Sequence, residues 1–558
     1  MVQPTEDLVF VPLGGVGEIG MNLGLYGYGH GRNRTWLAVD MGVAFGHDDL
    51  PGVDAVLPDI RFLLERKAKL AGIVITHAHE DHYGALLDFW PQLEAPVYMT
   101  PFAAALLEAK RVGEPNAPKI PVTVVKQRDT FQVGPFGIEY IPVSHSIPEP
   151  NALAIRTPLG TVLHTGDWKL DPAPGLGIAT DDDRLAALGR EGVLALVADS
   201  TNAVREGVSP SEGEVAVVLE RLIAEAPHRV AVTSFASNVA RIRAVAEAAQ
   251  RAGRDVVIIG RSIRRAVDVA TELGYLDGLP PFLDQDAYGY LPRNRVVALM
   301  TGSQGEPRAA LSRIAAGDHR EVALSPGDRV IFSSRTIPGN ERAVNSIINT
   351  LVDFGAEVIT DRDALVHTSG HPRREEIRQI YDWTKPQIVI PVHGEALHLH
   401  EQAKIARAVG IPQVVEVRNG NMVRLAPGRA ERLDSVVHGR LYRDGRLLVP
   451  HEESGVGERR RLAFAGVVSV AIVLSDSGDI LEDPAVSLLG LPAADREGER
   501  LQGILEEAVD EALDSLPKPR RRDAGLVREA VRRAVRAEVD IAWGKKPLAI
   551  VHVTHVSD

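Results

Sequence analysis

The residues best suited to chemistry are four potential ligands crowded into six positions. His77, His79, Asp81 and His82 stand in the segment that begins at Thr76, directly after an apolar run that predicts a strand. A regular strand or helix cannot point all four side chains one way, whereas a strand that breaks into a tight loop and then starts a helix can bring them together. Imidazole and carboxylate are the ligands that zinc takes where thiolates are absent. The segment predicts that His77 and His79 face one metal and that Asp81 and His82 face a second; a solvated loop with incidental histidines is the plainer alternative.

Three further candidates follow predicted strands. Asp167 ends a Thr-Gly-Asp segment at the carboxyl end of a strand, where α/β sites gather, and could bridge two metals, although aspartates there are often helix caps. His145 stands alone after a short strand, and by itself it is more often a surface or core histidine. His393 follows the apolar strand 388–390, as metal ligands at strand ends do.

A late segment carries two more histidines. His367 and His371 flank Thr368, Ser369 and Gly370, small residues whose exposed amides could hold a phosphate oxygen. Seven of the 18 histidines therefore fall into four strand-end clusters. An incidental distribution does not account for that grouping.

A framework of strands must position these ligands. The first ~200 residues alternate short β-rich runs with helical patterns, and several runs are apolar throughout, as in strands covered on both faces. The class is therefore α/β. A second helix–strand alternation starts after Ser209, a predicted helix N-cap with Pro210 at the first position and Glu212 completing a capping box. The strand at 387–391 resembles the first part again, so the middle domain is expected to be an insertion.

The remaining chain predicts a linker and a small terminal domain. The segment 452–458 reads as a linker, and an alternating strand at 466–474, two charged helices and a final strand at 547–556 follow it. The predicted domains are 1–208 and 370–450 (the two parts of the first domain), 209–369 (the insertion), 451–463 (a linker) and 464–558 (an α+β domain).

One motif is a decoy. Gly15, Gly17 and Gly20 match the dinucleotide fingerprint, and Asp40 follows at the expected distance. However, the next residues are glycine-rich and alternating, which predicts another strand and not the phosphate-binding helix that the motif requires. We do not expect a nucleotide there.

Composition sets broad limits. The 558 residues suggest about three or four domains, and the absence of cysteine excludes disulfides, thiolate nucleophiles and Cys-ligated metal sites. A net charge of −13 argues weakly against a protein coated in nucleic acid, but net charge is an average and bound cations reverse the local sign. No apolar run reaches the ~20 residues of a membrane span, and residues 1–7 show no signal-peptide pattern, so we expect a cytoplasmic protein without membrane attachment.

The order of these blocks resembles a known superfamily. His-x-His-x-Asp-His, a lone histidine and Thr-Gly-Asp resemble the metallo-β-lactamase superfamily, and the insertion looks like that of its β-CASP branch. Asp199, at a strand end, is similar to the first extra motif of that branch, and His371 and His393 fit its second and third. From about Leu8 onward the layout closely resembles the bacterial ribonuclease J family. The implied fold is an α/β, αββα metallo-β-lactamase sandwich with an inserted β-CASP α/β domain and a small α+β C-terminal domain.

The resemblance also implies site residues. One zinc would be held by His77, His79, His145 and Asp167, and the second by Asp81, His82, His393 and the shared Asp167. Mn²⁺ or Mg²⁺ could replace zinc. The substrate phosphates would be contacted by His367, Thr368, Ser369, Gly370 and His371, and a pocket for a 5′-terminal phosphate would be completed by Ala236, Ser237 and Asn238.

The implied activity is metal-dependent cleavage of single-stranded RNA: 5′-to-3′ exonucleolytic digestion favouring 5′-monophosphate ends, with endonucleolytic cleavage, in RNA maturation and decay. Two metals ~4 Å apart would lower the pKa of a bridging water toward ~7 for in-line attack on phosphorus. We expect His371 to bind a nonbridging oxygen or to protonate the leaving 3′-oxygen, with Asp199 orienting it and Asp81 counted among the catalytic residues. A homodimer or homotetramer, and RNA-degradation partners, are implied in the same way.

Three alternatives stay open. A small-molecule metallohydrolase would share the ligands as far as Asp167 but would have no use for a large inserted domain. A DNA nuclease of the same branch is closer, because nothing in the sequence directly reads a 2′-hydroxyl. A non-catalytic scaffold would be favoured only if ligands were missing, and the sequence contains them all.

Overall fold

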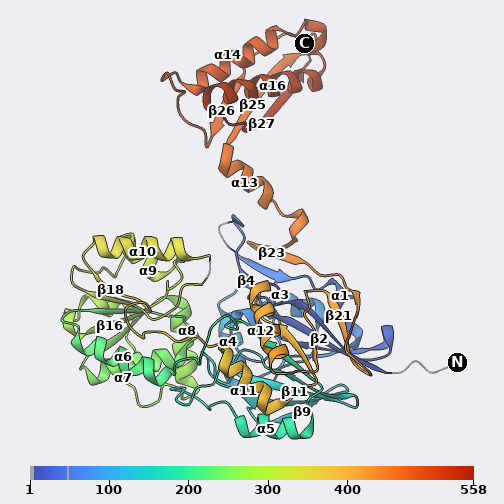
Figure 1. Ribbon diagram of the computed structural model, residues 1–558. Helices are drawn as coiled ribbons and strands as arrows, with labels where there is room; N and C mark the ends of the chain where they lie inside the picture. The colour runs from blue at the N-terminus through green and yellow to red at the C-terminus, as the bar shows by residue number, and fades with distance from the viewer. Residues whose placement is uncertain (1–5, 47–48, 338, 558) are drawn as a thin grey trace, which may run out of the picture. The chain divides into compact units, whose positions relative to one another are not determined.

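The computed structural model describes residues 6–46, 49–337 and 339–557, and the chain divides into two compact units (Figure 1). The first unit comprises 1–45 and 55–441, and the second comprises 46–54 and 442–558. Residues 1–5, on which the expectation about a signal peptide mainly rested, lie outside the described residues. Within the described ranges no helix combines the length and the apolar character that a membrane span requires.

Two mixed sheets form the frame of the first unit. The larger sheet runs, from edge to edge, through β22 (Glu431–Ser435), β21 (Asn421–Ala426), β1 (Asp7–Gly14), β2 (Leu23–Gly29), β3 (Thr35–Val39), β6 (Leu70–Val74), β7 (Val97–Met99) and β8 (Val122–Val124). The second sheet runs through β20 (Gln413–Val414), β19 (Ile388–Val392), β13 (Ala195–Asp199), β12 (Gly160–His164), β11 (Asn151–Thr157), β10 (Phe136–Pro142) and β9 (Thr130–Val133). Strands from before and after the inserted segment therefore meet in each sheet.

The two sheets share one apolar core. Leu37 and Val74 of the larger sheet belong to the same buried cluster as Ile138, Val162 and Ile390 of the second. These strands are apolar on both faces because each sheet is covered on its other side as well. Burial at ~25 cal/mol per Å² of apolar surface makes this core a main source of stability for the unit.

Helices cover the outer faces. The second sheet is covered by α5 (Asp182–Glu191) and α11 (Arg374–Thr384), whose Leu188 and Ile380 join a separate buried cluster with Leu196. On the larger sheet, Phe62 of α1 (Arg61–Leu64) packs edge-on against Trp36, with ring centroids 5.3 Å apart. The resulting layers are helix, sheet, sheet and helix, the arrangement expected from the sequence.

The segment after β13 forms a third, all-parallel sheet, seen in green and yellow in Figure 1. Its order is β15 (Asp255–Ile259), β16 (Val296–Met300), β14 (Val230–Thr233), β17 (Arg329–Phe332) and β18 (Glu357–Ile359). Its connecting helices are α6 (Glu212–Glu225), α7 (Val239–Arg251), α8 (Arg261–Glu272), α9 (Ala310–Ala315) and α10 (Glu341–Asp353). The expected helix–strand alternation is thus confirmed as an inserted parallel α/β body.

The start of α6 differs from the expectation. The N-cap is Ser211 and not Ser209, and the capping box pairs Ser211 with Glu214. Ser209 instead donates its hydroxyl to Glu376, 2.8 Å away on α11. Because Ser209 bonds to a distant helix, α6 starts two residues later than predicted. The capping chemistry itself is the one expected.

The second unit contains a three-stranded sheet under two long helices. The strand order is β26 (Ala485–Leu489), β25 (Val467–Ser475) and β27 (Leu548–Val556), and the helices are α14 (Leu501–Asp514) and α16 (Ala524–Trp543). The expected linker, 451–463, contains most of helix α13 (Val456–Ala465). The predicted domain boundaries stay predictions.

Candidate metal centre

The predicted ligands meet where strands end. His77 and His79 follow β6, Asp167 follows β12, and His393 follows β19. The short helix α2 (Glu80–Tyr83) begins directly after His79, so the strand does break into a loop and then a helix start as expected. Because these strands belong to two facing sheets, their ends converge on one place.

The first group consists of His77, His79, His145 and Asp167, whose candidate ligand atoms all lie within 4.8 Å of one another. Nδ1 of His79 is 3.1 Å from Nε2 of His77 and 3.0 Å from Nε2 of His145. Oδ2 of Asp167 lies 3.8 Å and 3.7 Å from the same two Nε2 atoms. Ligand atoms ~2.0–2.1 Å from a tetrahedral zinc ion would be ~3.3 Å apart, so the spacing suits one such ion.

The second group shares Asp167 with the first. It comprises Asp81, His82, Asp167 and His393, again within 4.8 Å. Oδ2 of Asp167 is 3.2 Å from Nε2 of His82 and 3.5 Å from Nε2 of His393. One carboxylate therefore reaches both groups, which is the bridging position expected for it.

Two buried polar atoms in the centre have no hydrogen-bond partner among the described residues. They are Oδ1 of Asp167 and Nε2 of His393. An unsatisfied buried polar atom costs ~1–3 kcal/mol, so its presence in a folded protein calls for an explanation. A bound cation supplies one, because each atom offers a lone pair toward the shared space. The residues present therefore fit the implied metals.

The electrostatics of the centre also suit metal binding. Burial lowers the pKa of His77 and of His145 well below the ordinary value, which leaves both imidazoles uncharged and able to ligate. Burial alone would raise the pKa of Asp167, but His393 and His82 hold it well below its usual range. Asp167 and Asp81 outweigh burial and raise the pKa of His82 well above its ordinary value, so these carboxylates would hold a positive charge at Nε2 of His82, either a proton or a cation that replaces it. This pocket of negative charge attracts a cation.

Residues that hydrogen-bond to the metal ligands set the tautomers of the imidazoles. The sequence did not reveal these supporting residues. Nδ1 of His82 donates to Asp40 at 2.7 Å, and Nδ1 of His393 donates to Asn22 at 2.8 Å. These bonds leave each Nε2 lone pair facing the centre. The only sequence signal for Asp40 is the decoy motif, in which it stands at the expected distance from the glycines. The structure confirms that β2, and not a helix, follows that glycine segment.

Gly370 also acts behind a ligand. Its carbonyl accepts a hydrogen bond from Nδ1 of His145 at 2.7 Å, which ties the late segment to the first metal group. A Cβ at Gly370 would come within 2.4 Å of that nitrogen, so only glycine permits the approach. The sequence predicts a phosphate contact for Gly370 and does not reveal this carbonyl contact.

His371 and Asp199 form a pair beside the metal groups. Nδ1 of His371 donates to Oδ2 of Asp199 at 2.7 Å and lies 3.9 Å from Oδ2 of Asp167. Burial alone would lower the pKa of His371, but Asp199 and Asp167 raise it to about 9. The imidazole is therefore protonated at neutral pH, with Nε2–H as a free acid group.

The remaining predicted substrate residues lie on two segments. Ala236, Ser237 and Asn238 form the loop between β14 and α7, where Asn238 caps the helix through the N–H of Arg241. In the second segment, Thr368 donates its hydroxyl to the carbonyl of Pro210 at 2.7 Å.

The other side chains of that segment are also held by the protein. Ser369 accepts from Asn202 at 2.9 Å. Burial, and next Arg241, lower the pKa of His367 well below its ordinary value, which leaves this ring neutral. The Asn238 and Thr368 side chains are hydrogen-bonded within the protein, whereas the hydroxyl of Ser369 acts only as an acceptor there. The hydroxyls of Ser237 and Ser369, and the backbone amides that are not already paired, are therefore the donors left for a phosphate on these two segments.

A buried arginine joins the two segments. Arg241 of α7 donates to the carbonyl of Val366 at 2.9 Å and to Oγ of Ser333 at 2.6 Å, and it forms an ion pair with Glu212 at 2.8 Å. All of these groups lie in the interior. Arg241 therefore fixes the start of α7 against the segment that leads to His371.

Four family models match successive parts of the chain. They are "Beta-lactamase superfamily domain" over 49–186, "Ribonuclease J, beta-CASP domain" over 227–351, "Zn-dependent metallo-hydrolase RNA specificity domain" over 355–415 and "Ribonuclease J C-terminal domain" over 455–556. The second model falls on the inserted parallel sheet, and the last falls on the second compact unit. The predicted fold class is thus confirmed as a metallo-β-lactamase fold with a β-CASP insertion and a C-terminal domain.

Solved structures and curated relatives agree with these matches. A protein of unknown function from Enterococcus faecalis, 16% identical, superposes with a TM-score of 0.51 over 75% of this chain and all of its own, which bears on the fold alone. The chain is 57% identical to ribonuclease J of Sinorhizobium meliloti over 99% of this chain and 98% of that one. It is 40% identical to ribonuclease J of Mycolicibacterium smegmatis, over 98% and 96% of the two chains. These relatives span nearly the whole sequence, and the chain belongs to the ribonuclease J family.

Proposed function

We propose that this protein is a metal-dependent ribonuclease that digests single-stranded RNA from the 5′ end, favours a 5′-monophosphate and also cleaves internally. One observation carries the proposal: two ligand groups share Asp167, and the His371–Asp199 pair lies directly beside them. Family membership supports RNA as the substrate, as does the match of 355–415 to an RNA specificity domain. Preference for the 5′ end follows from the resemblance set out above.

We propose two Zn²⁺ ions per chain, held by His77, His79, His145, Asp81, His82, His393 and the shared Asp167, with Mn²⁺ or Mg²⁺ as possible replacements. Such ions, when bound, activate water and offset the charge that grows on the phosphoryl oxygens. The chain supplies the rest of the mechanism. Asp40, Asn22 and the Gly370 carbonyl hold three imidazoles in their ligating tautomers.

His371 then delivers the proton. Because Asp199 keeps the ring protonated and takes Nδ1–H, the free Nε2–H can bind a nonbridging oxygen or pass to the leaving 3′-oxygen. The scissile phosphate would lie beside the two ligand groups, within reach of Nε2 of His371. Beyond it, the segments 236–238 and 367–371 offer a place for a 5′-terminal phosphate.

The proposed function is tested with four substrates: 5′-monophosphate RNA, 5′-triphosphate RNA and the two matched DNAs, each with and without chelator. We expect mononucleotides to be released from the monophosphate RNA and release to stop with chelator. Equal digestion of DNA would favour the DNA-nuclease alternative. Cleavage that persists in chelator would contradict the metal mechanism.

We also propose a homodimer or homotetramer that assembles through the second unit. One face of its sheet packs on α14 and α16, as the buried Val470 and Leu505 show. The opposite face carries Leu489, Leu548 and Ile550, which are 70%, 48% and 39% exposed. Apolar rows of this kind on a sheet face mark interaction sites.

A further inference from the structure

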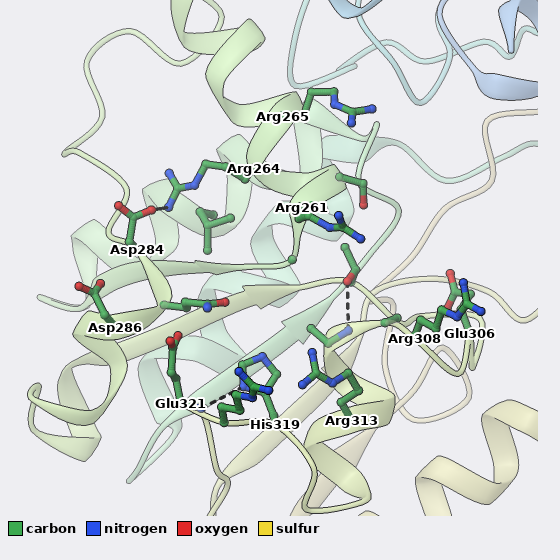
Figure 2. A pocket seen from close by; sticks show the side chains of 18 residues that line it. Arg261, Arg264, Arg265, Asp284, Asp286, Glu306, Arg308, Arg313, His319 and Glu321 are labelled. Carbon is green, nitrogen blue, oxygen red and sulfur yellow. Dashed lines mark hydrogen bonds and ion pairs between the residues drawn. The ribbon is translucent and has the colours of Figure 1, made fainter. Parts of the chain in front are cut away.

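The inserted domain contains a large crevice that the proposed mechanism does not use. It encloses about 1210 Å³ at the carboxyl ends of β15 and β16, and its lining runs from Ile258 to Glu321 (Figure 2). None of its lining residues is a predicted metal ligand or phosphate contact. In open parallel sheets, ligands bind outside the carboxyl ends of the strands, which is where this crevice lies.

Arginines dominate its charge. Six of the 18 lining residues are arginines, against four carboxylates. Arg264 is neutralised by Asp284, whereas Arg261, Arg308 and Arg320 form no ion pair with any residue that the structure describes. Figure 2 shows Arg261, Arg308 and Arg313 along one side, with Asp284, Asp286 and Glu321 along the other. Unpaired guanidinium groups that share a concave wall are suited to phosphate, which they bind in a bidentate manner.

The backbone at the start of α8 faces the same space. The N-cap is Gly260, and no side chain caps this 12-residue helix, so its first N–H groups are available to an anion. A Cβ at Gly260 would come within 2.6 Å of Oγ1 of Thr301, so glycine is needed to bring the helix start close to the end of β16. The helix dipole therefore adds to the field of the arginines.

The opposite side offers a different chemistry. Nδ1 of His319 accepts the N–H of Val322 at 3.2 Å, so in the neutral ring Nε2 carries the proton and is a donor. Asp286 and Glu321 are acceptors suited to hydroxyl or amino groups. No tryptophan, tyrosine or phenylalanine lines the crevice, so base stacking would not contribute to binding.

We propose that this crevice is a second phosphate-binding site, which takes two adjacent phosphate groups of a nucleotide ligand on Arg261, Arg308 and the N–H groups at the start of α8. The ribose hydroxyls or amino groups of that ligand face Asp286 and Glu321. The phosphates come either from a free nucleoside diphosphate or from neighbouring nucleotides of RNA. The RNA source rests on the proposed function, whereas the free-nucleotide source does not.

The test is calorimetric titration of the full-length, metal-loaded protein with ADP and with pyrophosphate. The variants are Arg261→Glu/Arg308→Glu and the milder Arg261→Gln/Arg308→Gln, which guards against loss of folding. Arg221→Glu, an exposed arginine on α6 outside the crevice, is the matched control. We expect one class of sites to weaken about tenfold or more in both double variants and to stay unchanged in the control.

A second arm uses a short 5′-hydroxyl RNA, checked by gel to be intact after the measurement. The phosphates come from RNA if the double variants bind ADP unchanged but bind RNA more weakly. In that case the magnitude of the slope of log K against log salt for RNA binding should fall by about 1.4, because two phosphate contacts are lost. If neither probe distinguishes the double variants from wild type, the proposal is overturned. The ADP titration involves no cleavage, so its outcome does not depend on the RNA cleavage assay. Failure of this proposal can therefore be distinguished from failure of the proposed function.

Discussion

Asp167 is the residue on which the centre depends, because one carboxylate serves two ligand groups. It lies 3.2–3.8 Å from imidazole nitrogens of His77, His82, His145 and His393. Each group otherwise has its own ligands, so the two metals should be separable by substitution. Loss of a ligand that belongs to one group alone should remove one ion and leave the other.

Asp81 offers that test. In Asp81→Ala we expect zinc per chain to fall from two to one, because its carboxylate belongs only to the second group. Since loss of a residue behind a ligand already costs ~10–100-fold in metal affinity, loss of the ligand itself should cost more, and turnover should disappear. Elemental analysis measures the metal, with Asp183→Ala, an exposed acid on α5, as control. Unchanged zinc content would reject the assignment, and His393→Ala should behave like Asp81→Ala.

His371 should behave differently. In His371→Ala we expect both metals to remain and RNA cleavage to fall by ~10²–10⁴-fold, because a positioned acid contributes about that much. Asp199→Asn should give a smaller loss, since the carboxylate acts through the 2.7 Å bond to His371. Metal content and single-turnover cleavage rates are measured together. Full cleavage by His371→Ala would show that this imidazole moves no essential proton.

The ligands could be predicted from the sequence, but their supports could not. Four ligands stand within six positions, so local spacing reveals them. Asp40, Asn22 and Gly370 act through contacts that span 42, 371 and 225 residues, and nothing in the sequence near each ligand marks them. Asp40 and His393 also adopt left-handed backbone conformations, with φ of 62° and 52°, which only the folded chain shows.

At the scale of elements, the start of α7 depends on one buried ion pair. In Arg241→Met we expect a loss of ~3–5 kcal/mol in stability, because Glu212 is left charged and unpaired in the interior. The melting temperature reports this loss. Arg251→Met, at the other end of α7, breaks an exposed pair with Glu220 of α6 and should cost ~0–1 kcal/mol. Recovery of stability in Arg241→Met/Glu212→Gln would confirm the cause, and equal melting of Arg241→Met and wild type would refute it.

A second ion-pair cluster fastens α5 to the second sheet. Hydrogen bonds from Arg184, and also from Arg156, hold the pKa of Glu139 below its ordinary value of 4.5. A depressed pKa means that the pair stabilises the fold above pH ~4.5 and loses this effect as pH falls through the folded-state pKa. Glu139→Gln should therefore lower the melting temperature at pH 7, and the difference from wild type should vanish as pH falls below the folded-state pKa of Glu139. Because the side chains of Arg184 and Arg156 are 26% and 32% exposed, the effect should stay near ~1 kcal/mol. A difference that persists at low pH would point to packing instead.

The elements were more predictable than their ends. Apolar periodicity located the strands and helices of the inserted domain, because both faces of a parallel sheet are buried. The cap moved from Ser209 to Ser211 because Glu376, far along the chain, binds Ser209. The expected linker contains α13. This helix is rich in charged residues and has no apolar stripe, so its sequence pattern does not indicate a helix.

For the whole molecule, net charge proved a poor guide to partners. The net charge of −13 includes buried carboxylates that are paired with His82, His371 and Arg241 inside the protein. The crevice of the inserted domain shows the converse, a local excess of arginine in an acidic protein. Charge must therefore be evaluated at each site and not over the chain.

Assembly is the property of the whole molecule that the second unit should control. Register aligns Leu489, Val467 and Leu548 across its three strands, so they form one apolar row on the open face of the sheet. In Leu548→Glu/Ile550→Glu we expect the dimer or tetramer to dissociate, because two charges would be buried without partners in the interface. Light scattering after size exclusion gives the mass, and Ile541→Glu, exposed on α16, is the matched control. If the double variant keeps the wild-type mass, another surface holds the assembly; if wild type is itself a monomer at micromolar concentration, the proposed oligomer is wrong.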